Sequence, residues 1–290
     1  MIGRFGKSVV WIAGGPFSLW REHRGAVLPL SLLALALAVL SPACGILLWL
    51  SLPPLGRLTR RLHRFRLLAT LAVFSAIYVP IAFAVVPGIG RQFGRVALPR
   101  SASKEAPLRP ANLGFSLLGR NYIRPECARV AEAVAREVVA AHGGAITYLD
   151  AGFPLGGVPL IPHLSHSDGR KLDVAFRYRS RSTGLPVDSS PSLVGYWVYE
   201  PPRRGEPAPC DDREGALRWD FRWLQWLGSR HEVDEAATRD LILAFAARPE
   251  VEKILLEPHL KERFEIRNPK VRFQGCEAAR HDDHFHVQFR

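Results

Sequence analysis

The chain has 290 residues, of which 48% are hydrophobic, and a formal net charge of +12 at pH 7. That combination is typical of a nucleic-acid-binding protein or of a membrane protein. Residues 1–110 hold 14 of the 39 Lys and Arg but only 2 of the 27 acidic residues, so the remainder is balanced at 25 of each. A neutral C-terminal part argues against a phosphate-binding surface, and no nucleic-acid partner is expected.

A basic N-terminal tail, residues 1–25, precedes two long uncharged runs at residues 26–52 and 67–90. A helix of about 20 apolar residues is long enough to cross a bilayer. Buried helices of soluble proteins are usually shorter and amphipathic. The first run is long for a cleavable signal peptide and lacks a convincing cleavage site. We therefore expect residues 26–90 to form a retained membrane anchor of two transmembrane helices.

The connector between the two runs predicts the orientation of this anchor. Its sequence, LGRLTRRLHRFR, places five arginines within ten residues. Positively charged loops tend to stay in the cytoplasm. With two spans, the N-terminus and the C-terminal domain would then both lie outside the cytoplasmic membrane. Basic residues also flank the two runs at their other ends, so the density of the connector cluster decides the orientation.

Residues 91–110 mix Pro, Ser and charge without apolar periodicity, which predicts a linker before a soluble domain at residues 111–290. Helical spacing of apolar residues predicts helices over Arg124–Ala141 and Asp234–Arg248. Strand-like segments lie between and around them, namely Ile146–Leu149, Leu172–Tyr178, Gly195–Tyr199, Trp219–Phe221, Lys253–Leu256 and His284–Phe289. Interspersed helices and strands predict an α+β fold, with an antiparallel sheet and flanking helices.

Three cysteines, Cys127, Cys210 and Cys276, lie in the predicted soluble domain. Outside the cytosol, an oxidising compartment permits one disulfide among them, and three pairings are open. We favour the pairing of Cys210 with Cys276. None of the three has the CxxC spacing of a cysteine zinc site.

Five of the ten histidines fall in two short segments, PHLSHSDGRKLD at 162–173 and RHDDHFHV at 280–287. In the second segment, strand alternation puts His284 and His286 on one face and Phe285 and Val287 on the other. Two imidazoles on one strand face suit either two metal ligands or one ligand beside a catalytic base.

The first segment supplies His166 and Asp173, with Gly169 allowing a turn between them. These two residues and a distant histidine give three ligands of mixed nitrogen and oxygen type. The fourth position stays open for water, which is the pattern of a catalytic rather than a structural zinc site. Each residue alone is more often a surface or turn residue, so the clustering is what predicts Zn²⁺ binding.

The strings HLSHSDGRKLDVAF and ARHDDHFHVQF resemble the two signatures of the penicillin-insensitive murein endopeptidases. This family belongs to the zinc peptidase superfamily of lysostaphin-type endopeptidases, D-alanyl-D-alanine peptidases and hedgehog domains. Three further segments, RNYIRPECARVAEAV, YLDAGFPLGG and EVEKILLEPHLKERF, are similar to segments of that family, and the resemblance covers residues 113–290.

The resemblance implies that His166, Asp173 and His286 bind Zn²⁺ and that His284 is the general base. It also implies that His163 and His281 line the site, where either one would stabilise the oxyanion, when protonated, or orient the water. The implied protein is a hydrolase anchored in the bacterial inner membrane. Its catalytic domain would face the periplasm and hydrolyse D-alanyl–meso-diaminopimelate cross-links of peptidoglycan, the cell-wall polymer.

Several alternatives remain open from the sequence. The same site would serve a D-alanyl-D-alanine carboxypeptidase or dipeptidase if Arg170 or Lys171 bound a free carboxylate, and Lys171 stands where the family often has an acid. The domain could also be a catalytically silent cell-wall binding module. Two smaller groups have two readings each. Asp282 and Asp283 either position the histidines or are solvated turn residues. The tryptophans Trp219, Trp223 and Trp226 form either a sugar-stacking surface or part of the core.

Overall fold

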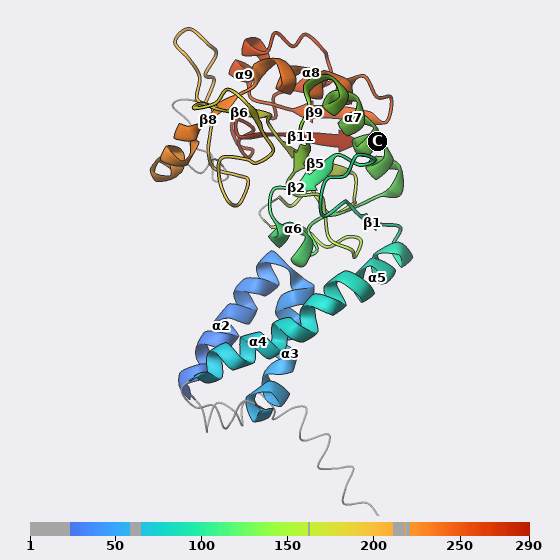
Figure 1. Ribbon diagram of the computed structural model, residues 1–290, viewed down its shortest axis with the longest axis vertical. Helices are drawn as coiled ribbons and strands as arrows, with labels where there is room; N and C mark the ends of the chain where they lie inside the picture. The colour runs from blue at the N-terminus through green and yellow to red at the C-terminus, as the bar shows by residue number, and fades with distance from the viewer. Residues whose placement is uncertain (1–23, 59–64, 162, 211–217, 219–220) are drawn as a thin grey trace, which may run out of the picture. The chain divides into compact units, whose positions relative to one another are not determined.

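The computed structural model describes residues 24–58, 65–161, 163–210, 218 and 221–290 of the chain (Figure 1). The fold divides into two compact units, residues 1–86 and residues 87–290. Each unit is described by itself. The first contains the apolar helices, and the second contains the sheets and both histidine segments.

The first unit contains the helices α2 (Arg24–Leu40), α3 (Pro42–Leu58) and α4 (Arg66–Pro80). In the described residues, one helix is long and apolar enough to cross a membrane, the continuous stretch Leu67–Gln92 formed by α4, the π-helical turn η2 (Ile81–Val85) and α5 (Val86–Gln92). The predicted hairpin of two spans is therefore wrong. The first apolar run breaks at Ser41 because Pro42 disfavours helical geometry in the residue before it. Two helices of 17 residues result.

Helices α2 and α3 are joined by Ser41 alone and pack against each other (Figure 1). The contact is close at Gly45, where an added Cβ would lie 2.5 Å from the carbonyl oxygen of Ala34 and 2.3 Å from Cα of Ala38. Small residues allow such close approach of helix backbones in an apolar environment. The first apolar run therefore turns back on itself.

The second unit is α+β, which confirms the predicted fold class. Its six-stranded sheet has the order β10-β9-β11-β5-β4-β2. The bounds of these strands are Val271–Arg272, Val251–Leu255, His284–Phe289, Lys171–Ala175, Ile146–Tyr148 and Leu108–Pro110. The central strand pairs are antiparallel, but β10 with β9 and β2 with β4 are parallel. The sheet is therefore mixed rather than antiparallel throughout.

Two helices match the sequence prediction closely, α7 (Pro125–His142) and α8 (Glu235–Ala246). They pack against each other over the sheet (Figure 1). The core beneath them takes alternate residues of the two central strands, Leu172 and Val174 from β5 and Phe285, Val287 and Phe289 from β11. The intervening residues of both strands point to the opposite face of the sheet. That opposite face carries the candidate site.

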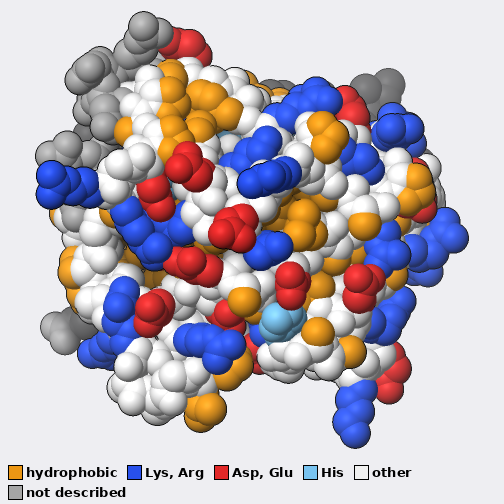
Figure 2. Space-filling model, turned by 90° about the horizontal axis from the view of Figure 1, so that it is seen from above, with side chains coloured by type: hydrophobic (Ala, Val, Ile, Leu, Met, Phe, Trp, Pro, Cys, Tyr) orange, Lys and Arg blue, Asp and Glu red, His pale blue; other side chains and the backbone are white. Residues whose placement is uncertain are grey.

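Smaller elements complete this unit. A two-stranded sheet pairs β1 (Val96–Ala97) with β3 (Tyr122–Ile123), and a three-stranded sheet has the order β7-β6-β8, with bounds Pro186–Val187, Tyr178–Ser180 and His231–Val233. Short helices lie at Leu113–Leu117 (α6), Arg222–Arg230 (η3, a 3₁₀-helix) and Pro258–Arg263 (α9). Figure 2 shows Lys and Arg side chains intermixed with Asp and Glu over the face that it presents.

Some local predictions differ from the structure. Residues 91–110, predicted to be a linker, contribute β1 and β2, and Arg95, Leu98 and Leu108 in this stretch are buried. The folded unit therefore begins before Ala111. Residues 195–199, predicted to be a strand, form an irregular segment beside the site. Of the predicted strand 219–221, residues 219 and 220 lie outside the described residues.

Cys210 and Cys276 form a disulfide, which confirms the favoured pairing. Cys127 is the remaining thiol of the three and is buried in α7. Burial raises its pKa to about 12. This thiol therefore stays protonated and behaves as a small apolar core residue.

The core position of Phe285 gives a test of the strand register. Its side chain is fully buried between Phe176 and Phe245, with ring centroids 6.5 Å and 5.9 Å away. Replacing Phe285 with alanine is expected to lower the free energy of unfolding by about 3–5 kcal/mol, because a cavity replaces the ring. Chemical denaturation measures this loss. A loss below about 1 kcal/mol would contradict the inward orientation of Phe285.

Candidate metal centre

The site is built on the two central strands, β5 and β11. Asp173 on β5 lies directly opposite His286 on β11 in the antiparallel register. Opposed residues of an antiparallel pair project from the same face of the sheet. Because the residues flanking each of them pack into the core, Asp173 and His286 must point to the other face. His284, two residues before His286, shares that face.

His166 comes from the loop that precedes β5. The guanidinium of Arg95 fastens this loop, since Nη1 donates to the carbonyl of Phe153 at 2.9 Å and Nη2 donates to that of Ser167 at 2.5 Å. Gly169 follows with a φ of 72°, in the left-handed region that favours glycine. The loop is therefore held in place around His166 by a buried arginine from the stretch that was predicted to be a linker.

Three side-chain atoms converge at the centre of the site. His166 Nε2 lies 3.1 Å from His286 Nδ1 and 3.3 Å from Asp173 Oδ1, and the last two atoms are 2.7 Å apart. Ligand atoms bound tetrahedrally about 2 Å from a zinc ion are roughly 3.3 Å from one another. All three side chains are buried. The atoms therefore fit a small tetrahedral metal ion after minor adjustment.

The second ring nitrogen of His166 supports this assignment. Nδ1 donates to the carbonyl oxygen of Ala151 at 2.8 Å. A histidine that donates from Nδ1 keeps the lone pair of Nε2 available for a metal, and metal-bound histidines commonly have such a partner. The backbone of residue 151 therefore fixes the tautomer that metal binding requires.

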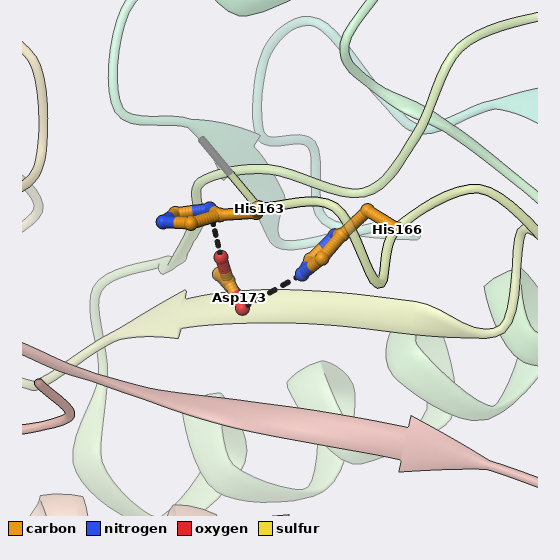
Figure 3. Close-up of side chains that lie close together, drawn as sticks. All are labelled: His163, His166 and Asp173. Carbon is orange, nitrogen blue, oxygen red and sulfur yellow. Dashed lines mark ion pairs between the residues drawn. The ribbon is translucent and has the colours of Figure 1, made fainter. Parts of the chain in front are cut away.

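His163 joins the same cluster from the other side of Asp173. His163, His166 and Asp173 each offer a ligand atom, and the three atoms lie within 4.8 Å of one another, so this group could also hold a metal ion. Figure 3 shows that the two histidines approach different oxygens of Asp173. The structure thus brings together two overlapping sets of three, which share His166 and Asp173 and differ in His163 or His286.

The hydrogen bonds of His163 favour His286 as the third ligand. His163 Nδ1 lies 3.0 Å from Asp173 Oδ2 and 3.2 Å from Asp150 Oδ2, so this nitrogen carries a proton between two carboxylates. Burial disfavours the charged imidazole, but attraction to Asp173 and Asp150 outweighs it and raises the pKa of His163 to about 10. These two carboxylates thus favour the protonated form of His163.

His284 lies beside the converging atoms and has a fixed orientation. Its Nδ1 is hydrogen-bonded to Oδ1 of Asp283, and its Nε2 lies 3.9 Å from Oδ2 of Asp173. Burial lowers the pKa of His284, but the charges of Asp283 and Asp173 outweigh this effect and raise it above the usual value. A histidine oriented by a carboxylate in this way is suited to accept a proton at Nε2.

The environment of His281 differs from that expected. Its ring lies 5.2 Å from the ring of His284 and 5.9 Å from that of His286, so it does line the site. Burial and the two neighbouring imidazoles hold its pKa well below the usual value. His281 is therefore neutral, and of the two histidines considered for the cationic role only His163 is suited to it.

Two residues of the site were not recognised as functional from the sequence, Tyr196 and Asp150. The hydroxyl of Tyr196 donates to Oδ2 of Asp173 at 2.8 Å and lies 3.0 Å from Oδ2 of Asp150. Burial and these two carboxylates raise the pKa of Tyr196 well above its usual value, so the hydroxyl keeps its proton. Asp150 in turn forms two hydrogen bonds with the buried guanidinium of Arg120, at 2.6 Å and 2.8 Å.

The two readings of Asp282 and Asp283 are now distinguished, because both side chains are buried rather than solvated. Asp283 accepts from the backbone N–H of Trp197 and holds His284. Asp282 instead pairs with Arg280, and burial raises the pKa of Asp282 to about 6. Asp283 is thus the positioning residue.

Replacing Asp283 with asparagine is expected to lower kcat by about 10–100-fold, the usual effect of removing the outer partner of a site histidine. The bound metal should be retained, because Asp283 does not contact the three converging atoms. Activity and metal content measured on the same sample test this, with the exposed Asp240→Asn variant as control. Loss of metal in the Asp283 variant would contradict the separation of its role from metal binding.

No protein-family model matches the chain, and no curated protein matches it at a significant level.

Proposed function

We propose that the chain is a membrane-anchored zinc peptidase that hydrolyses the peptide cross-links of peptidoglycan, at D-alanyl–meso-diaminopimelate bonds. The observation that carries the proposal is the convergence of His166 Nε2, Asp173 Oδ1 and His286 Nδ1 within 3.3 Å of one another, beside a histidine oriented by a carboxylate. Three ligands of this type leave one position open for water, as in zinc hydrolases.

The chemistry would be amide hydrolysis. When bound, zinc lowers the pKa of its water to about 7 and polarises a carbonyl group. His284 accepts the proton of the attacking water at Nε2 and passes it to the leaving amine. Asp283 keeps the ring of His284 in place, and Tyr196 fixes the second oxygen of Asp173. The positive charge of His163 stabilises negative charge that develops at the carbonyl oxygen.

The surroundings of Lys171 argue against one of the two cations that a carboxypeptidase would use. A carboxypeptidase needs an uncompensated cation for the terminal carboxylate of its substrate. The ammonium of Lys171 is paired with Asp168, and its side chain is 12% exposed. Lys171 thus does not supply that cation, and Arg170, whose Nε is buried without a hydrogen-bond partner among the described residues, is the remaining candidate for it. The choice of peptidoglycan itself rests on the resemblance of the two histidine segments to the murein endopeptidases.

Digestion of purified, cross-linked murein by the full-length chain with Zn²⁺ tests the proposal. Conversion of cross-linked dimers to monomers is the expected result. Release of terminal alanine alone would instead identify a carboxypeptidase or dipeptidase. Unchanged murein, together with bound metal, would support the alternative of a catalytically silent cell-wall binding module. The His284→Ala variant controls for contaminating hydrolases.

Two features support an extracytoplasmic location for the proposed enzyme. An apolar helix at Leu67–Gln92 and the disulfide Cys210–Cys276 are consistent with a domain anchored outside the cytosol. We propose that α2 and α3, which fold back on each other, return the chain to the side from which it entered. The basic tail and the arginine-rich connector then both face the cytoplasm, as positive charge favours. This reverses the orientation that two spans would give to the N-terminus.

The orientation predicts opposite results for two reporter fusions. A fluorescent protein that folds only in the cytoplasm should be active at the N-terminus of the chain, and an alkaline phosphatase that needs an oxidising compartment should be active at the C-terminus. An active phosphatase at the N-terminus would contradict the proposed orientation and place the N-terminus outside the cytoplasm, as two spans would. Cytoplasmic activity at the C-terminus would exclude peptidoglycan as the substrate.

A further inference from the structure

An apolar groove with a volume of about 730 Å³ lies between residues 191–197 and the helix η3. Two of its lining side chains, Trp223 and Trp226, are 70% and 69% exposed. They are therefore not core residues, which was one reading of the tryptophan cluster. Large apolar side chains gathered at a surface usually mark a binding site.

The two walls of the groove are fastened to each other. Gln225 of η3 donates from Nε2 to the carbonyl of Trp197 at 2.8 Å and accepts from the backbone N–H of Tyr199 at 2.9 Å. The rings of Trp197 and Phe221 are 5.0 Å apart. These contacts fix the position of the exposed tryptophans relative to residues 197–199.

The same segment reaches the candidate metal centre. The backbone N–H of Trp197 donates to Asp283, which holds His284, and the hydroxyl of the preceding residue, Tyr196, donates to Asp173. Residues 196 and 197 thus face the site and the groove, respectively. A ligand in the groove would be held in a fixed relation to the proposed base.

We propose that this groove binds the glycan strand of the polymer whose peptides are cut at the metal centre, an inference that rests on the proposed function. A pyranose ring presents C–H groups on its faces and hydroxyls at its edges. The C–H faces pack on exposed indole rings such as Trp223 and Trp226. The sugar hydroxyls can form hydrogen bonds with the polar residues of the lining, which are Ser192, Ser229, Arg230 and His231.

The composition of the lining favours a sugar over a peptide stem. A stem peptide carries carboxylates and an ammonium group, whose transfer to an apolar surface without partners is costly. Among the described residues, the lining is mostly Leu, Val, Phe and Trp and includes no acidic residue to pair with an ammonium group. An uncharged sugar ring loses less hydration on such a surface.

The test compares the full-length chain with a Trp223→Ala/Trp226→Ala double variant. Calorimetry with peptide-free, N-acetylated murein glycan is expected to show an affinity at least about tenfold lower for the variant. The KM for intact murein should rise similarly. The kcat for a soluble cross-linked peptide without sugar should not change. Leu185→Ala, at a residue that is 64% exposed and outside the groove, is the matched control and should behave as the parent chain.

Equal glycan affinity in the parent and the double variant would overturn the inference, as would an absence of glycan binding to the parent. Reduced binding of the double variant to phosphatidylglycerol vesicles, with its glycan affinity unchanged, would assign the groove to a lipid surface. If neither murein nor the soluble peptide is cut, the proposed function fails. Glycan binding, which calorimetry measures independently of catalysis, would then still test the role of the groove.

Discussion

Replacing His286 with alanine is expected to remove the bound metal and to reduce hydrolysis to the background level. Nδ1 of His286 is one of the three converging ligand atoms, and without it only the two atoms of His166 and Asp173 remain, fewer than the three protein ligands of a catalytic zinc site. The loss should exceed the 10–100-fold that removal of an outer hydrogen-bond partner costs. Metal content by mass spectrometry and murein digestion on the same sample measure both effects.

The comparison with His163 separates the two overlapping ligand sets. His163→Ala should retain the metal, because its Nδ1 is engaged by Asp173 and Asp150. His142→Ala removes an imidazole that pairs with Asp240 at the surface and controls for nonspecific loss of zinc. If His163→Ala loses the metal and His286→Ala keeps it, the assignment of the third ligand is wrong.

Replacing His284 with alanine is expected to lower kcat by about 10²–10⁴-fold while the metal stays bound. This range is typical for loss of a general base. His284 contacts Asp173 only at 3.9 Å and is held mainly by Asp283, so its removal leaves the three ligand atoms in place. KM should change little, because the proposed role of His284 lies in proton transfer rather than in binding.

Single-turnover kinetics of the His284 variant tests this assignment, with metal content measured alongside. A variant that loses its metal would show that His284 is a ligand, the other role that two histidines on one strand face allowed. A variant with normal kcat would show that another group accepts the proton. Asp283→Asn should give a smaller loss of the same kind.

Much of the site could be predicted because its strands have a strong local pattern. In β11, Phe285, Val287 and Phe289 alternate with His284 and His286, so a single register separates core from site. The two long helices were equally clear, since their apolar residues recur at helical spacing and each has a proline or an acidic cap at its start. Local sequence is sufficient to predict an element and its buried face where the apolar periodicity matches the packing in the fold.

Contacts between distant segments could not be predicted. Tyr196 and Asp150 meet Asp173 from loops, where no periodicity marks them. Residues 195–199 have the composition of a strand, but Trp197 adopts a φ of 74° and the chain turns instead of pairing. The pattern of residues 91–110 gave no sign that Arg95 would be buried under the loop of His166.

The anchor was mispredicted for a physical reason visible in the sequence. Hydropathy over residues 26–52 measures transfer to lipid and is insensitive to a helix break. Pro42 ends the helix before it, and Gly45 then lets the two halves pack closely. Proline and glycine inside a long apolar run thus carried information on where the helix ends and turns back that its hydrophobicity did not.

The most direct test of the central claim is anomalous diffraction at the zinc edge from crystals of the zinc-loaded, full-length chain. We expect one peak bounded by His166 Nε2, Asp173 Oδ1 and His286 Nδ1, with His284 adjacent and outside bonding distance. A peak bounded by His163 in place of His286, or no peak among these residues at full zinc loading, would contradict the claim.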